Sequence, residues 1–66
     1  MNITVNGAPV ELAEATTVAQ LLADRLGQHR RAAVARNGEV VPRSEWSATV
    51  LSPGDTVEIL VAVAGG

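Results

Sequence analysis

The sequence of 66 residues lacks four residue types: it has no cysteine, no lysine, no phenylalanine and no tyrosine. Without cysteine the chain has no disulfide, no thiolate metal ligand and no thiol nucleophile of its own. Without lysine it cannot accept an isopeptide bond on a side chain, so it cannot form lysine-linked chains of itself. Trp46 is the single aromatic residue, so aliphatic side chains must build the core.

Long apolar runs and a strong excess of charge are also missing. No window approaches the roughly 18 apolar residues of a membrane span, and the start MNITVNG does not resemble a signal peptide. The formal net charge is −2, and the five arginines form no continuous basic stripe. We therefore expect a cytoplasmic protein with neither a membrane nor a nucleic acid as its partner.

The acidic residues and the single histidine show no pattern of a catalytic or metal site. His29 lies beside two arginines without an orienting partner, so we assign it no role. The carboxylates are scattered, with no metal-loop spacing. We interpret them as solubilising surface: Glu11, Glu14, Asp24, Glu39, Glu45, Asp55 and Glu58.

The first half of the chain predicts a hairpin followed by a helix. Apolar and polar residues alternate over 1–5, and Asn6-Gly7 is a strong turn signal before a return strand over 8–12. Thr17 and Gln20 have the spacing of a capping box, which predicts that a helix starts there. Its apolar face carries Val18, Leu21, Leu22 and Leu26, and Gly27 should end it.

The second half predicts two short strands and one long strand. Asn37-Gly38 joins two strands within 32–41, residues 44–46 form a single turn, and the turn at 52–55 precedes a final alternating strand over 57–64. A helix that crosses the sheet lets the last strand pair in parallel with the first. We therefore predict one α+β domain over 1–66, a β-grasp whose mixed sheet of four to five strands carries one main helix on one face.

The remaining reactive group is the α-carboxyl of Gly66, since no side-chain cluster supports catalysis and no phosphate loop supports ATP binding. This carboxyl has an ordinary pKa near 3.5, so at neutral pH it is an unreactive anion until a partner activates it, as adenylation does. Because glycine has no Cβ, a di-glycine tail can pass through a narrow channel and adopt any φ that an active site imposes. We expect Ala64, Gly65 and Gly66 to project as a flexible tail, the alternative being a frayed end without function.

Two stretches carry a resemblance to a known family: VARNGEVVPRSEW and LSPGDTVEILVAVAGG, the second of which ends in AGG. They resemble the sulfur carrier protein of thiamine biosynthesis, a ubiquitin-like β-grasp family, and the match in length and element order covers the whole chain. The resemblance implies that an E1-like enzyme adenylates Gly66 with ATP and Mg²⁺. Sulfur from a donor such as a cysteine desulfurase then forms a thiocarboxylate, which thiazole synthase consumes. The chain itself binds no cofactor.

Leu60 and Ala62 fall on the side of the final strand opposite Val57, Ile59 and Val61, where polar residues would be usual. They form either a strip that docks partners or a minor second core. Two related functions also remain open: the small subunit of molybdopterin synthase, which shares the fold and the Gly-Gly end, and a ubiquitin-like modifier that forms amide bonds. A plain interaction domain with an inert tail is the fourth reading.

Overall fold

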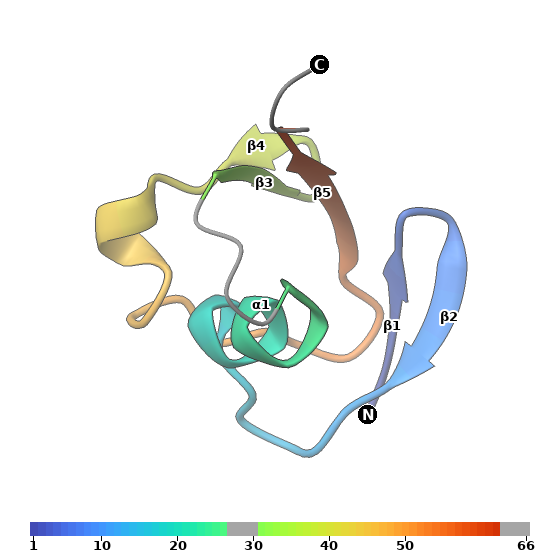
Figure 1. The fold of residues 1–66 in the computed structure, drawn as a ribbon. Coiled ribbons are helices and arrows are strands. Elements are labelled where there is room, and N and C mark those ends of the chain that lie inside the picture. The colour runs from blue at the N-terminus through green and yellow to red at the C-terminus, as the bar shows by residue number, and fades with distance from the viewer. Residues whose placement is uncertain (27–30, 63–66) are drawn as a thin grey trace.

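The computed structural model describes residues 1–26 and 31–62, which form a five-stranded mixed sheet with one α-helix on one face (Figure 1). The sheet has the order β2-β1-β5-β3-β4, and β1 and β5 run parallel at its centre. The strands are β1 (Asn2–Val5), β2 (Ala8–Glu11), β3 (Ala32–Arg36), β4 (Glu39–Val40) and β5 (Thr56–Val61). The helix is α1 (Val18–Leu26), and a 3-10 turn, η1, spans Arg43–Glu45. The predicted β-grasp architecture is therefore confirmed.

The capping box fixes where α1 starts. Gln20 N–H donates to Thr17 Oγ1 at 3.1 Å, and Thr17 N–H donates to Gln20 Oε1 at 2.9 Å. Two backbone donors that the helix would leave unpaired are thus satisfied. Gly27, the predicted end of the helix, lies outside the described residues.

Both Asn-Gly pairs form the hairpin turns that the sequence predicts. Asn6 and Asn37 have φ of 50°, and Gly7 and Gly38 have φ of 82° and 84°. Positive φ at both central residues matches the right-handed twist of the flanking strands. One turn joins β1 to β2, and the other joins β3 to β4.

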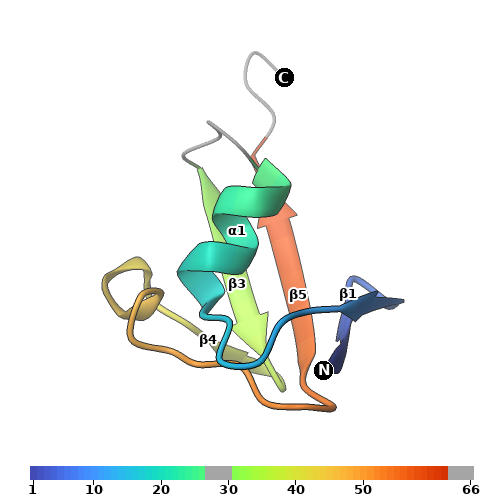
Figure 2. The same ribbon diagram turned by 90° about the horizontal axis from the view of Figure 1, so that it is seen from below.

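The core lies between α1 and the sheet. Figure 2 shows α1 crossing over β3 and β5. The buried apolar side chains are Ile3, Val5, Val18, Leu21, Leu22, Val34, Leu51 and Val57. Trp46 packs against this core, and its Nε1–H donates to the carbonyl of Val41 at 2.9 Å.

Three elements have boundaries that differ from the prediction. Strand β2 ends at Glu11, although Leu12 N–H still donates to the carbonyl of Met1 at 2.8 Å. The single turn starts at Arg43 because the carbonyl of Pro42 accepts the N–H of Glu45 at 2.8 Å. Strand β5 spans Thr56–Val61, and residues 63–64 of the predicted strand lie outside the described residues. None of the helices in the described part of the chain is long and apolar enough to cross a membrane.

Asp55 is a correction to the prediction that all carboxylates are solubilising surface. It is only 7% exposed. Its Oδ2 accepts Arg36 Nε–H at 2.7 Å and Ser52 N–H at 2.8 Å, and its Oδ1 accepts Asn37 Nδ2–H at 3.1 Å. A buried carboxylate with these hydrogen-bond partners stabilises the fold rather than adding to solubility.

Candidate docking face and C-terminal segment

Strand β5 presents two chemically different sides. Val57 is buried, and Ile59 packs against the core, so these side chains face α1. Leu60 lies on the opposite side and is 74% exposed, and Ala62 is exposed as well. Within the described residues Leu60 therefore belongs to no second core, which removes that alternative.

The register of the sheet brings further apolar residues to the same side as Leu60. In antiparallel strands, directly paired residues share a face. Leu60 pairs with Ala33, Glu58 pairs with Ala35, and Ala35 also pairs with Val40, which is 76% exposed. We call this surface the open face and define it by Ala33, Ala35, Val40, Leu60 and Ala62.

The open face is hollowed by two shallow depressions. One is lined by Ala33, Ala35, Val40 and Leu60 together with Asn6 and Glu58. The other continues past Leu60 to Ala62 and Arg31. Contiguous exposed apolar surface of this kind makes the open face a candidate interaction site. The sequence indicated Leu60 and Ala62. It did not indicate Ala33, Ala35 or Val40, because only the strand register places these three residues beside Leu60.

The open face leads directly to the chain that precedes the predicted modification site. Ala62 N–H donates to the carbonyl of Arg31 at 3.0 Å, which holds the last described residue beside β3. Ala64, Gly65 and Gly66 lie outside the described residues, so their predicted projection is not tested. A partner seated on the open face would lie next to the point where residues 63–66 begin.

The start of β5 is fixed by the buried cluster around Asp55. Asn37 Oδ1 accepts the N–H of Thr56 at 2.9 Å, and Asn37 N–H donates to the carbonyl of Thr56 at 2.7 Å. Burial acts to raise the pKa of the Asp55 carboxyl, but hydrogen bonds from Ser52, Asn37 and Arg36, with the charge of Arg36, hold it below its ordinary 3.8. The charged form is thus the one that the fold stabilises.

The described residues hold neither a candidate metal cluster nor an unpaired buried polar side-chain atom. No group of three or more histidine, cysteine or acidic side chains that could hold a metal ion occurs in residues 1–26 and 31–62. The buried side-chain polar atoms of the same ranges all have hydrogen-bond partners. The candidate site is the open face, together with the predicted modification site at Gly66, which lies outside the described residues.

Comparison with known proteins decides the family. The model of the ThiS family matches residues 3–66. The chain belongs to the ThiS family. Among curated relatives of this ThiS-family chain, the sulfur carrier protein ThiS of Escherichia coli is 32% identical over 66 residues, and the alignment covers both proteins in full. The resemblance to the thiamine sulfur carriers is confirmed, in preference to the molybdopterin synthase subunit.

A second curated relative is a much longer protein. A Paramagnetospirillum magneticum protein named thiazole synthase is 33% identical over 66 residues. The alignment covers all of this chain but 20% of that protein, so the chain spans about a fifth of this relative's length.

Solved structures of ThiS-family proteins share the fold. The crystal structure of the thiamine biosynthesis protein ThiS from Geobacter metallireducens matches with a TM-score of 0.83 and 42% identity, over all of both chains. A solution NMR structure of a thiamine biosynthesis protein from the same organism matches with a TM-score of 0.80 and 43% identity, over all of this chain and 88% of the other.

Proposed function

We propose that this chain is a sulfur carrier in thiamine biosynthesis and that it carries sulfur covalently at the α-carboxyl of Gly66. The observation that supports this most strongly is the full-length alignment with the E. coli sulfur carrier protein ThiS. The composition agrees, because a chain without cysteine has no thiol on which to hold the sulfur atom. The chain is then a carrier on which partner enzymes act, not an enzyme.

The first step activates the carboxylate. An oxygen of the Gly66 carboxylate attacks the α-phosphorus of ATP, which an E1-like adenylating enzyme holds with Mg²⁺, and pyrophosphate leaves. The acyl-adenylate is a good electrophile because AMP is a far better leaving group than oxide. ATP and Mg²⁺ belong to that enzyme, and we propose that the cycle runs in the cytoplasm.

The second step replaces AMP by sulfur. A persulfide, charged by a donor such as a cysteine desulfurase, attacks the acyl carbon, and AMP leaves with the bonding electron pair. The product is an acyl disulfide, and a cysteine thiol of a partner must cleave its S–S bond, since this chain supplies none. That cleavage leaves a thiocarboxylate on Gly66 and a disulfide on the partner.

Thiazole synthase is the proposed acceptor of this sulfur. Support comes from the P. magneticum protein of that name, one fifth of which aligns with this whole chain. We further propose that Leu60 and Ala62 dock the partner enzymes, because they lie on the exposed open face immediately before residues 63–66. Docking there brings Gly66 to a partner's active site.

The test is intact-mass analysis after incubation with the adenylating enzyme, ATP, Mg²⁺ and a persulfide donor. The mass should rise by the difference between one sulfur and one oxygen, and the change should map to the C-terminal peptide. Deleting Gly66 should abolish it without lowering the melting temperature. Adding one residue after Gly66 should also abolish it, because the reacting carbonyl moves by about 3.5 Å, beyond near-attack distance.

Two outcomes would contradict the proposal. One is a lengthened protein that acquires sulfur efficiently at its new terminus. The other is a native protein that acquires none under conditions that load a known carrier. Amide-linked products with other proteins would instead identify a ubiquitin-like modifier.

A further inference from the structure

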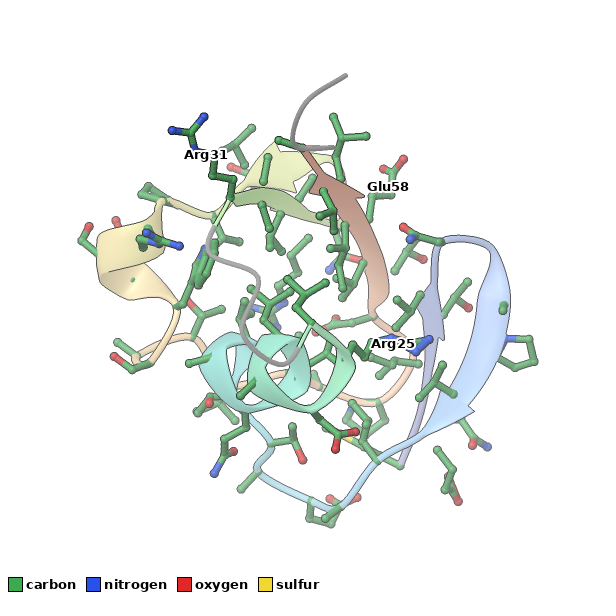
Figure 3. The ribbon with its side chains drawn as sticks, viewed as in Figure 1. Arg25, Arg31 and Glu58 are labelled. Atoms are coloured by element: carbon green, nitrogen blue, oxygen red, sulfur yellow. The ribbon has the colours of Figure 1, made fainter. Side chains whose placement is uncertain are left out.

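Two charged side chains, Arg31 and Glu58, lie on the same side of the sheet as the open face. Figure 3 shows both of them on the side away from α1, whereas Arg25, in the last turn of α1, lies on the helix side. Arg31 and Glu58 are exposed. Among the residues that the structure describes, neither has an ion pair or a side-chain hydrogen bond.

The register places these charges at opposite ends of the apolar strip around Leu60. Glu58 pairs with Ala35, and Leu60 pairs with Ala33. Arg31 comes next, because its carbonyl accepts the N–H of Ala62 at 3.0 Å. From residue 58 to residue 62 a strand rises about 13 Å, which exceeds the Debye length of about 8 Å at physiological ionic strength. The two charges therefore act on a partner separately instead of neutralising each other.

Apolar contact alone cannot set the direction of docking. The hydrophobic effect is non-directional, and a strip of alanine, valine and leucine side chains can be covered in either sense. Only one docking direction brings the end of the strip next to Ala62, and with it residues 63–66, toward a partner's active site. The docking surface therefore needs a feature that selects this direction. Opposite charges at the two ends do so, because docking in the reverse direction would place each of them beside a like charge of the partner.

We propose that Arg31 and Glu58 set the direction in which the open face docks on thiazole synthase. The partner surface that fits has an apolar centre for Leu60, an acidic side chain opposite Arg31 and a basic side chain opposite Glu58. This inference rests on the proposed function and adds to it the charge pattern of the acceptor enzyme. Thiazole synthase is the chosen occupant because the comparisons link a chain of this kind with a protein of that name.

The deciding variant exchanges the two charges, combining Arg31→Glu with Glu58→Arg. The net charge stays at −2, so any effect of total charge is removed. The matched control combines Asp24→Arg with Arg25→Asp, which exchanges two exposed charges of α1 and also keeps the net charge. Association and dissociation rates with purified thiazole synthase are measured at low and at physiological salt, and melting temperatures check the fold of each variant.

We expect the exchange at residues 31 and 58 to slow association roughly tenfold or more at low salt, with a smaller effect as salt rises. The control exchange should stay within about twofold of the native protein. Arg31→Ala and Glu58→Ala should each slow association by a few fold, which tests the charges one at a time with minimal risk to folding.

The outcomes separate this inference from the proposed function. If the exchange at 31 and 58 binds like the native protein while Leu60→Asp binds poorly, the charge pattern is wrong and the docking face stands. If the control exchange is as harmful as the exchange at 31 and 58, the direction is not set by these two residues. If the native thiocarboxylate protein neither binds thiazole synthase nor gives it sulfur, the proposed partner itself is wrong.

Discussion

Asn6 binds the backbone of Ile59 through both polar atoms of its side-chain amide. Its Nδ2–H donates to the carbonyl of Ile59 at 3.2 Å, and the N–H of Ile59 donates to Asn6 Oδ1 at 2.8 Å. The two residues are 53 positions apart in the sequence. A turn residue thus continues the parallel pairing of β1 with β5 beyond Val5 and Val57, where the backbone ladder ends. It fixes the backbone immediately before Leu60.

Replacing this amide should weaken the centre of the sheet. Asn6→Asp keeps the acceptor for the N–H of Ile59 but sets a carboxylate oxygen against the Ile59 carbonyl in place of a donor. We expect a loss of about 1–2 kcal/mol in the free energy of unfolding, measured in urea at pH 7. Asn2→Asp is the control, since Asn2 is exposed on the same strand. Equal losses in the two variants would show that the Asn6–Ile59 bonds contribute nothing.

Neutralising Asp55 should cost more than neutralising an exposed carboxylate. Asp55→Asn removes the charge that Arg36 pairs with at 2.7 Å and turns one acceptor into a donor inside a buried cluster. We expect a loss of about 2 kcal/mol or more, because buried groups are left imperfectly paired. Asp24→Asn, on the exposed side of α1, should change stability by less than about 0.5 kcal/mol. Similar values for the two variants would refute the structural role of Asp55.

The same carboxyl should make stability fall in acid. Because the folded state holds the pKa of Asp55 below 3.8, the unfolded state takes up a proton first as the pH drops. Protonation then favours unfolding, so the contribution of Asp55 is present above about pH 4 and disappears as the pH falls through the folded-state pKa. Unfolding free energies measured between pH 7 and pH 2 should fall more steeply for the native protein than for Asp55→Asn. Parallel curves would assign the acid sensitivity to other groups.

Leu60→Asp should impair docking on the adenylating enzyme without weakening the fold. Leu60 is 74% exposed, so a carboxylate there stays hydrated in the free protein but loses water when a partner covers it. We expect binding at least tenfold weaker in calorimetric titration and an unfolding free energy within about 0.5 kcal/mol of native. Val50→Asp is the matched control, because Val50 is 50% exposed and pairs with Thr17 away from the open face. A large loss of stability in Leu60→Asp would instead show that the Leu60 side chain is packed in a core.

Local signals in the sequence located most of the elements. Thr17 and Gln20 marked the start of α1 because a capping box involves residues three positions apart, and the Asn-Gly pairs marked turns that span four residues. The parallel pairing of β1 with β5 was also predictable, since a crossover helix leaves the last strand few other places in a small sheet.

Features that join distant residues could not be read in the same way. Asp55 lies next to Arg36 and Asn37 only after folding, and in the sequence it looks like any turn aspartate. Val40 and Ala33 belong to the open face only through the registers of β4 and β5 with β3. Hydrophobic alternation within β5 did indicate Leu60, because that signal lies within one strand.

The indole of Trp46 gives this protein a built-in optical probe. With no tyrosine or phenylalanine in the chain, near-ultraviolet absorption and intrinsic fluorescence arise from this one side chain. Its ring packs on the core and its N–H is bonded to Val41, so unfolding moves it from an apolar contact into water and shifts its emission to longer wavelength. Fluorescence from Trp46 therefore reports the folding of the domain from one known position, with no label attached.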